Sequence, residues 1–105
     1  MSSVLLEMAM FPTDKGESVS EYVSRIIKMI DESGLSYKLT PMGTVLECSS
    51  MDEALGIIKK AYECLEKDCN RVYSTIKFDI RKNKENRIKE KIESVARVLK
   101  RELKT

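Results

Sequence analysis

The amino-acid sequence predicts an α+β fold of the ferredoxin-like type, a four-stranded antiparallel sheet with two helices on one face and an extra C-terminal helix. Strand-like segments and segments with a helical apolar stripe follow one another in the order β-α-β-β-α-β, and one more helical stripe comes after them. The chain has 105 residues and shows no linker or low-complexity segment. We therefore expect one domain over residues 1–105.

The first predicted strand covers residues 3–11, "SVLLEMAMF", whose nearly continuous apolar character is typical of a central strand. A helix is predicted from about residue 18 to residue 33, because apolar residues recur there at helical spacing. Ser18 and Glu21 have the spacing of a capping box, in which two backbone N–H groups are satisfied reciprocally. Gly34 suits the left-handed position that follows a helix.

Residues 35–39 and 44–49 predict two short strands joined by the turn "TPMG". A second helix is expected from residue 51 to about residue 68, again behind a capping-box pair, Ser50 and Glu53.

Residues 71–81, "RVYSTIKFDIR", alternate strongly and predict the last strand, with Val72, Ile76, Phe78 and Ile80 on one face. The final helix is expected from about residue 85 to residue 103.

Two helices on one face of the sheet leave the other face uncovered. Strand alternation assigns to it a mixture of apolar and charged side chains, which is typical of a subunit interface, a ligand site or both. These side chains are Leu5, Glu7, Ala9, Phe11, Lys38, Thr40, Val45, Glu47, Tyr73, Thr75, Lys77, Asp79 and Arg81.

The two carboxylates of this face have two interpretations. Glu7 and Glu47 come from neighbouring strands, and Lys77 comes from the strand on the other side of Glu7. The lysine could simply neutralise them. Alternatively, one carboxylate could accept charge-assisted hydrogen bonds from a ligand amine or amidine.

The composition narrows the chemistry. The sequence contains no histidine, which removes His-assisted nucleophiles and His-ligated metals. Its three cysteines form no C-x-x-C motif, and no export signal or membrane span is visible, so free thiols in a reducing cytoplasm are expected. The last 25 residues carry a net charge of +6 and the first 80 a net charge of −4. The basic end could attract phosphates or complement the acidic body.

Three segments of the chain, "MAMFPTDKGESVSEYV", "ESGLSYKLTPMGTVLE" and "VYSTIKFDIRKN", resemble the small thiamine-binding protein family of YkoF-like, ferredoxin-like fold. The similarity runs from about Val4 to the last helix. It implies a non-catalytic binder of thiamine or its hydroxymethylpyrimidine moiety, without a cofactor, that forms dimers pairing into tetramers. Relatives often carry a glycine after the position of Glu47, where this chain has Cys48.

The chemistry of an aminopyrimidine suggests roles for the candidate ligand-binding residues. A carboxylate can accept from the exocyclic amine, a hydroxyl can serve a ring nitrogen, an aromatic ring can stack, and a methionine can fill irregular space. Ser18 could instead be only a helix cap, and Tyr37 and the methionines could be core residues. The candidates are Glu47, Thr44, Tyr37, Ser18, Met42, Phe11 and Glu7.

Two other functions stay open at this point. One is a structural or regulatory oligomer with a different ligand, such as an anion at the Ser18 helix start. The other is a nucleic-acid-binding module that uses the uncovered sheet face and the basic end, although the aromatic motif of RNA-binding sheets is absent. An enzyme is disfavoured, because no nucleophile, metal set or phosphate loop is visible.

Overall fold

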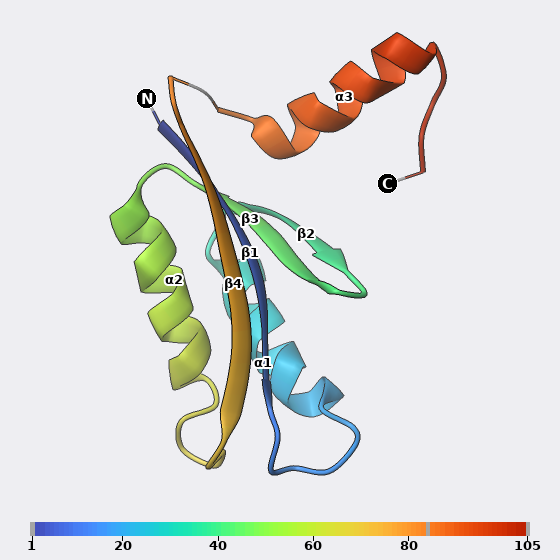
Figure 1. Ribbon diagram of the computed structural model, residues 1–105. Helices are drawn as coiled ribbons and strands as arrows, with labels where there is room; N and C mark the ends of the chain where they lie inside the picture. Colours follow the sequence, from blue (N-terminus) through green and yellow to red (C-terminus); the bar gives the residue numbers. More distant parts are fainter. Residues whose placement is uncertain (1, 84, 105) are drawn as a thin grey trace.

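A computed structural model describes residues 2–83 and 85–104 and confirms the α+β prediction (Figure 1). The strands form one antiparallel sheet in the order β2-β3-β1-β4, the order of a ferredoxin-like fold. The elements in chain order are β1 (Ser2–Pro12), α1 (Ser20–Glu32), β2 (Ser36–Thr40), β3 (Gly43–Cys48), α2 (Met51–Glu63), β4 (Val72–Lys82) and α3 (Arg87–Leu99).

The core lies between β1 and the two helices α1 and α2. Alternate residues of β1 point to the helices, and Leu6, opposite both Leu46 of β3 and Phe78 of β4, is completely buried. Ile30 of α1 and Leu65, just after α2, are equally buried. The apolar alternation predicted for the first strand therefore sets the core face of the sheet.

Of the two predicted helix caps, the one at Ser50 is confirmed and the one at Ser18 is wrong. Ser50 accepts a hydrogen bond from the Glu53 N–H at 3.1 Å, as expected, and the Glu53 carboxylate accepts from the Ser49 N–H at 2.9 Å. The capping box at Ser18 is wrong, because α1 starts at Ser20 and its N-cap is Val19, without a side-chain hydrogen bond. Ser18 thus precedes the capping position. The helix α2 ends at Glu63, and residues 64–68 continue as turns.

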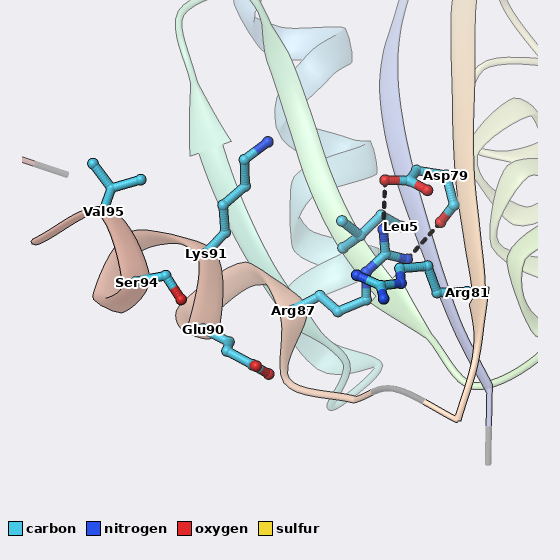
Figure 2. Close-up of a pocket in the computed structure, with 8 residues that line it drawn as sticks. All are labelled: Leu5, Asp79, Arg81, Arg87, Glu90, Lys91, Ser94 and Val95. Carbon is cyan, nitrogen blue, oxygen red and sulfur yellow. Dashed lines mark hydrogen bonds and ion pairs between the residues drawn. The ribbon is translucent and has the colours of Figure 1, made fainter. Parts of the chain in front are cut away.

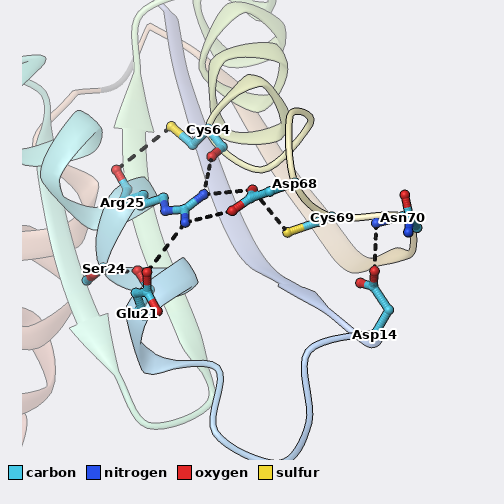
Figure 3. Close-up of polar contacts among 8 residues, drawn as sticks. All are labelled: Asp14, Glu21, Ser24, Arg25, Cys64, Asp68, Cys69 and Asn70. Atoms are coloured by element: carbon cyan, nitrogen blue, oxygen red, sulfur yellow. Dashed lines mark hydrogen bonds and ion pairs between the residues drawn. The ribbon is translucent and has the colours of Figure 1, made fainter.

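A polar network fastens α1 to the segment after α2 (Figure 3). The Arg25 guanidinium donates to both carboxylate oxygens of Asp68 at 2.9 Å and to the Cys64 carbonyl at 3.3 Å. This guanidinium holds the pKa of the Asp68 carboxyl below its usual range. Nearby, Asp14 accepts from the Asn70 N–H at 2.8 Å, which ties the loop after β1 to the approach of β4.

The helices do not cover β4. Ile76, Phe78 and Ile80 lie on the predicted helix-facing side, yet they are 36%, 39% and 52% exposed. The reason is geometric, since β4 is an edge strand and α2 packs on β1 and β3. The predicted alternation of this strand is confirmed, and its apolar row stays partly exposed.

The helix α3 stands apart from α1 and α2, beyond the end of the sheet where β4 finishes (Figure 1). It contacts β3, β1 and β2. Its apolar stripe is only partly covered, because Val95 is 45% and Leu99 54% exposed.

Two glycines give a matched test of backbone conformation. Gly34 follows the C-cap of α1 at φ +80°, whereas Gly56 lies inside α2, and a Cβ at either position meets no atom within 4 Å. We expect Gly34→Ala to lower the free energy of unfolding by about 1 kcal/mol, because the left-handed region penalises a Cβ. Gly56→Ala should raise it by about 0.5–1 kcal/mol. Urea denaturation measures both, and a stabilising Gly34→Ala would contradict the assignment.

Candidate functional site

The structure places Glu47 on the uncovered face of the sheet, as predicted, but at the end of β3 that lies far from the β2–β3 turn. Its carboxylate accepts from the Ser3 hydroxyl at 2.7 Å and from the backbone N–H groups of Arg87 and Ile88 at 3.0 and 3.5 Å. These two amides open α3. Glu47 therefore caps that helix from a distant strand, where a negative charge also suits the helix dipole.

These contacts determine the charge state of Glu47. Burial alone raises the pKa of this carboxyl, but the hydrogen bonds from the Arg87 N–H and the Ser3 hydroxyl outweigh it. The net effect is a pKa below the ordinary value. Glu47 is thus an ionised group that accepts hydrogen bonds from other segments of the same chain.

The other carboxylate of this face has a simpler environment. Glu7 lies opposite Lys77 in the sheet, and the two side chains approach to 3.7 Å while both stay well exposed to solvent. Among the described contacts, Lys77 therefore pairs with Glu7, as one interpretation predicted, and does not pair with Glu47.

Tyr37 and Ser18 lie in separate places. The Tyr37 hydroxyl donates to Asp31 at 2.7 Å, this bond raises the pKa of the phenol, and the ring packs partly buried against the core. Ser18 is exposed before α1.

Phe11, Met42 and Thr44 do come together. They line a cavity of about 260 Å³ beside α1 and the β2–β3 turn, where β1 runs on past its pairing with β3. Thr44 is 5% exposed and faces away from Glu47. The two residues are three positions apart in β3, and residues an odd number of positions apart in a strand point to opposite faces. The remaining lining is mainly apolar and consists of Met8, Ala9, Met10, Val19, Val23, Ile26, Ile27, Leu39, Thr40, Pro41 and Gly43.

The α1 side of this cavity is not among the candidates predicted from the sequence. Val19, Val23 and Ile27 belong to the apolar stripe of the helix predicted from about residue 18, and such a stripe is typical of packing residues. Nothing in the periodicity of that stripe marks these three residues as lining a cavity.

A second hollow of about 370 Å³ lies between the uncovered face and α3 (Figure 2). Inside it the buried Arg87 guanidinium pairs with the Asp79 carboxylate and donates to the carbonyls of Asp79 and Ser3 at 2.8 and 3.3 Å. Arg87 thus binds both the carboxylate and the backbone carbonyl of Asp79. Arg87 and Glu47 together hold the start of α3 on the sheet.

The cysteines are free thiols in the described residues. Cys48 is buried on the helix side of β3, and burial raises the pKa of its thiol to about 11, which makes it a poor nucleophile at neutral pH. In residues 2–83 and 85–104, no group of three or more Cys, Asp or Glu side chains could hold a metal ion. Within these same ranges, no helix has the length and apolar character needed to cross a membrane.

The cap on α3 can be tested by substitution and by pH. Glu47→Gln should lower the amide-exchange protection factors of Arg87 and Ile88, because the amide is a weaker acceptor. The pKa of Glu47 is lowered by folding, so its stabilisation is complete above the unfolded-state pKa, about 4.3, and is lost as the pH falls through the folded-state value.

Hydrogen exchange should therefore show this acid loss in the wild type and not in Glu47→Gln. Glu7→Gln, on the same face, is the matched control and should leave both amides protected. Equal protection in the wild type and Glu47→Gln would contradict the cap.

Comparison with known proteins gives a consistent family. Residues 6–96 match the model of a family described as thiamine-binding protein. The chain is 39% identical over 95 residues to the UPF0045 protein MJ1052 of Methanocaldococcus jannaschii, covering 90% of this chain and 94% of that protein. It is 34% identical over 83 residues to the UPF0045 protein YqgV of Bacillus subtilis, covering 74% of this chain and 79% of that one.

Solved structures agree with the fold. The crystal structure of the M. jannaschii protein superposes with a TM-score of 0.80 at 38% identity and covers 91% of this chain and 98% of that one. A Thermotoga maritima protein, described provisionally as a thiamine biosynthesis/salvage protein, superposes with a TM-score of 0.76 at 22% identity, covering 89% and 98% of the two chains. Since the family model spans most of the sequence, the chain belongs to the thiamine-binding protein family.

Proposed function

We propose that the protein binds thiamine or its hydroxymethylpyrimidine moiety without transforming it and acts as a carrier or sensor. The observation that carries the proposal is the apolar cavity beside the β2–β3 turn in a chain that matches the thiamine-binding family model. The provisional description of the T. maritima structural neighbour points to the same ligand class.

The lining of the cavity suits a flat heteroaromatic ring. Apolar side chains of α1 and Leu39 can cover the ring faces, and Met42, 85% exposed on the turn, can close over the entrance. Thr44 and Thr40 contribute hydroxyl groups on the strand side of the cavity, which could form hydrogen bonds with a ring nitrogen or an exocyclic amine. The volume fits the pyrimidine part, which would leave the charged thiazolium at the opening.

We place the ligand with Phe11, Met42 and Thr44 rather than with Glu47. The Glu47 carboxylate already accepts from three donors, and it lies on the opposite face of the sheet from Thr44. Tyr37, Ser18 and Glu7 do not line the cavity and have no part in the proposal.

We also infer that the protein works in the cytoplasm as a homo-oligomer. Free cysteines suit a reducing compartment. The exposed apolar side chains of β4 and α3 favour association with further copies.

Isothermal titration with thiamine and with hydroxymethylpyrimidine tests the ligand. Val23→Phe should fill the cavity from α1 and weaken binding at least tenfold, because Val23 lines it. Val45→Phe, a matched change on the other face of β3, should bind like the wild type. Absence of heat from the wild type with either compound up to about 1 mM, roughly −4 kcal/mol, would overturn the thiamine proposal.

Thr44→Val tests the polar contact separately. It keeps the shape of the side chain and removes the hydroxyl, so the affinity for the pyrimidine compound should fall by about fivefold, or about 1 kcal/mol. Glu47→Ala should leave the affinity within twofold. The opposite ranking of these two variants would move the site to the uncovered face of the sheet.

A further inference from the structure

The hollow of about 370 Å³ between α3 and the uncovered face of the sheet has no part in the thiamine proposal (Figure 2). Its lining residues come from β1, β4 and α3. Among the described residues, none of them also lines the cavity beside α1. Small-molecule pockets usually have volumes of about 300–1,000 Å³. The hollow is therefore large enough for a small organic ligand and not only for a single ion.

A buried arginine is held in place in this hollow. Arg87 is 9% exposed, and its guanidinium pairs with the Asp79 carboxylate and donates to the carbonyls of Asp79 and Ser3. A guanidinium has five N–H groups, and the contacts of Arg87 within the described residues use three of them. The other two donors belong to a side chain that is already immobilised, so a ligand can bind them at a small cost in side-chain entropy.

The hollow has two further cations in its lining, Arg81 of β4 and Lys91 of α3, and neither has an ion-pair partner among the described residues. Arg87 already neutralises the carboxylate of Asp79. Glu90, the other acidic lining residue, points away from the Lys91 amine in Figure 2. Positive charge therefore exceeds negative charge around the hollow, which favours an anionic ligand.

The rest of the lining supplies one hydroxyl and an apolar wall. The Ser94 oxygen accepts from the Arg97 guanidinium at 3.1 Å, so its O–H group stays available as a donor. Leu5 and Val95 form the apolar wall, and Val95 is 45% exposed. Apolar surface beside several positively charged donors suits a ligand that has an anionic group on an apolar body.

We propose that this hollow binds a phosphomonoester. The phosphate group lies between Arg81 and Lys91, and its organic part packs against the apolar wall. Near neutral pH a phosphomonoester carries up to two negative charges and matches two cations, whereas a carboxylate leaves one cation unpaired. The planar guanidinium of Arg81 can donate to two phosphate oxygens at once, and the Lys91 ammonium can donate to the third.

Such a ligand also connects α3 to the sheet. The start of α3 is held by Glu47 and Arg87, whereas Val95, further along the helix, is half exposed. A phosphate group bound by Arg81 of β4 and Lys91 of α3 adds a contact between the two elements. Binding should therefore stabilise α3 in its place and slow amide exchange along the helix.

Isothermal titration of the full chain with phenyl phosphate tests the ligand class. Inorganic phosphate is the comparison that lacks an organic part, and benzoate is the comparison that carries a single charge. Phenyl phosphate should bind saturably and about fivefold more tightly than either one, the effect of one additional favourable contact. Absence of saturable binding up to about 1 mM phenyl phosphate would overturn the proposal, as would equal affinity for benzoate.

Matched substitutions on α3 test the location. Lys91→Gln should weaken phenyl phosphate binding about tenfold, because it removes a charged donor from the hollow. Lys89→Gln removes the same charge from the same helix, but Lys89 pairs with Glu93 and does not line the hollow. This control should stay within twofold of the wild type, and Arg81→Gln should resemble Lys91→Gln. Equal losses in the two lysine variants would reduce the binding to general attraction by the basic segment and contradict the site.

Amide exchange gives a second measurement of the location. At a phenyl phosphate concentration of ten times the Kd, the protection factors of the Lys91 and Val95 amides should rise about tenfold in the wild type. In Arg81→Gln they should stay unchanged at the same ligand concentration. The amide of the buried Leu6 should stay protected in both proteins, which controls for the fold. Unchanged exchange of α3 in a wild type that binds phenyl phosphate would place the ligand elsewhere and overturn the inference.

This inference does not depend on the thiamine proposal. Thiamine is a cation without a phosphate group, and Val23 lines only the cavity beside α1 among the two hollows. Val23→Phe should therefore leave the affinity for phenyl phosphate within twofold of the wild type. Thiamine binding without phenyl phosphate binding would overturn the phosphate site alone, and the reverse result would overturn the thiamine proposal alone.

Discussion

The double pairing of β1 is the constraint on which the rest of the molecule depends. β1 is bonded along one edge to β3 and along the other to β4, so its alternation decides the two faces of the whole sheet. The side that carries Leu6 must be covered by helices, which brings α1 and α2 together. A slip of β1 by one residue in this register would turn its buried side chains to the uncovered face.

Charged side chains on the face that α1 and α2 leave uncovered bind another part of the same chain, the start of α3. Glu47 satisfies the first amides of α3, and Arg87 bonds the carboxylate of Asp79 and two carbonyls of the sheet. Charged groups that looked available for a ligand are therefore structural contacts holding α3. This is a common consequence of attaching a helix N-terminus to a sheet, because its free amides require acceptors.

The cavity that Phe11, Met42 and Thr44 line and the exposed apolar row of β4 lie toward opposite edges of the sheet. The cavity is formed beside α1 and the β2–β3 turn, whereas Ile76, Phe78 and Ile80 belong to the edge strand on the other side of β1. Substitutions on α1 and on β4 therefore report on different properties of the protein.

Local periodicity and backbone preference were enough to predict the order of the elements, the core face of β1, the cap at Ser50 and the left-handed Gly34. The sequence also suggested that Phe11, Met42 and Thr44 belong to a candidate site. Tertiary contacts, in contrast, turn Glu47 to α3, leave Ser18 outside the helix cap and leave Ile76, Phe78 and Ile80 exposed. Those outcomes depend on which distant segments meet, and strand alternation specifies a face without specifying what covers it.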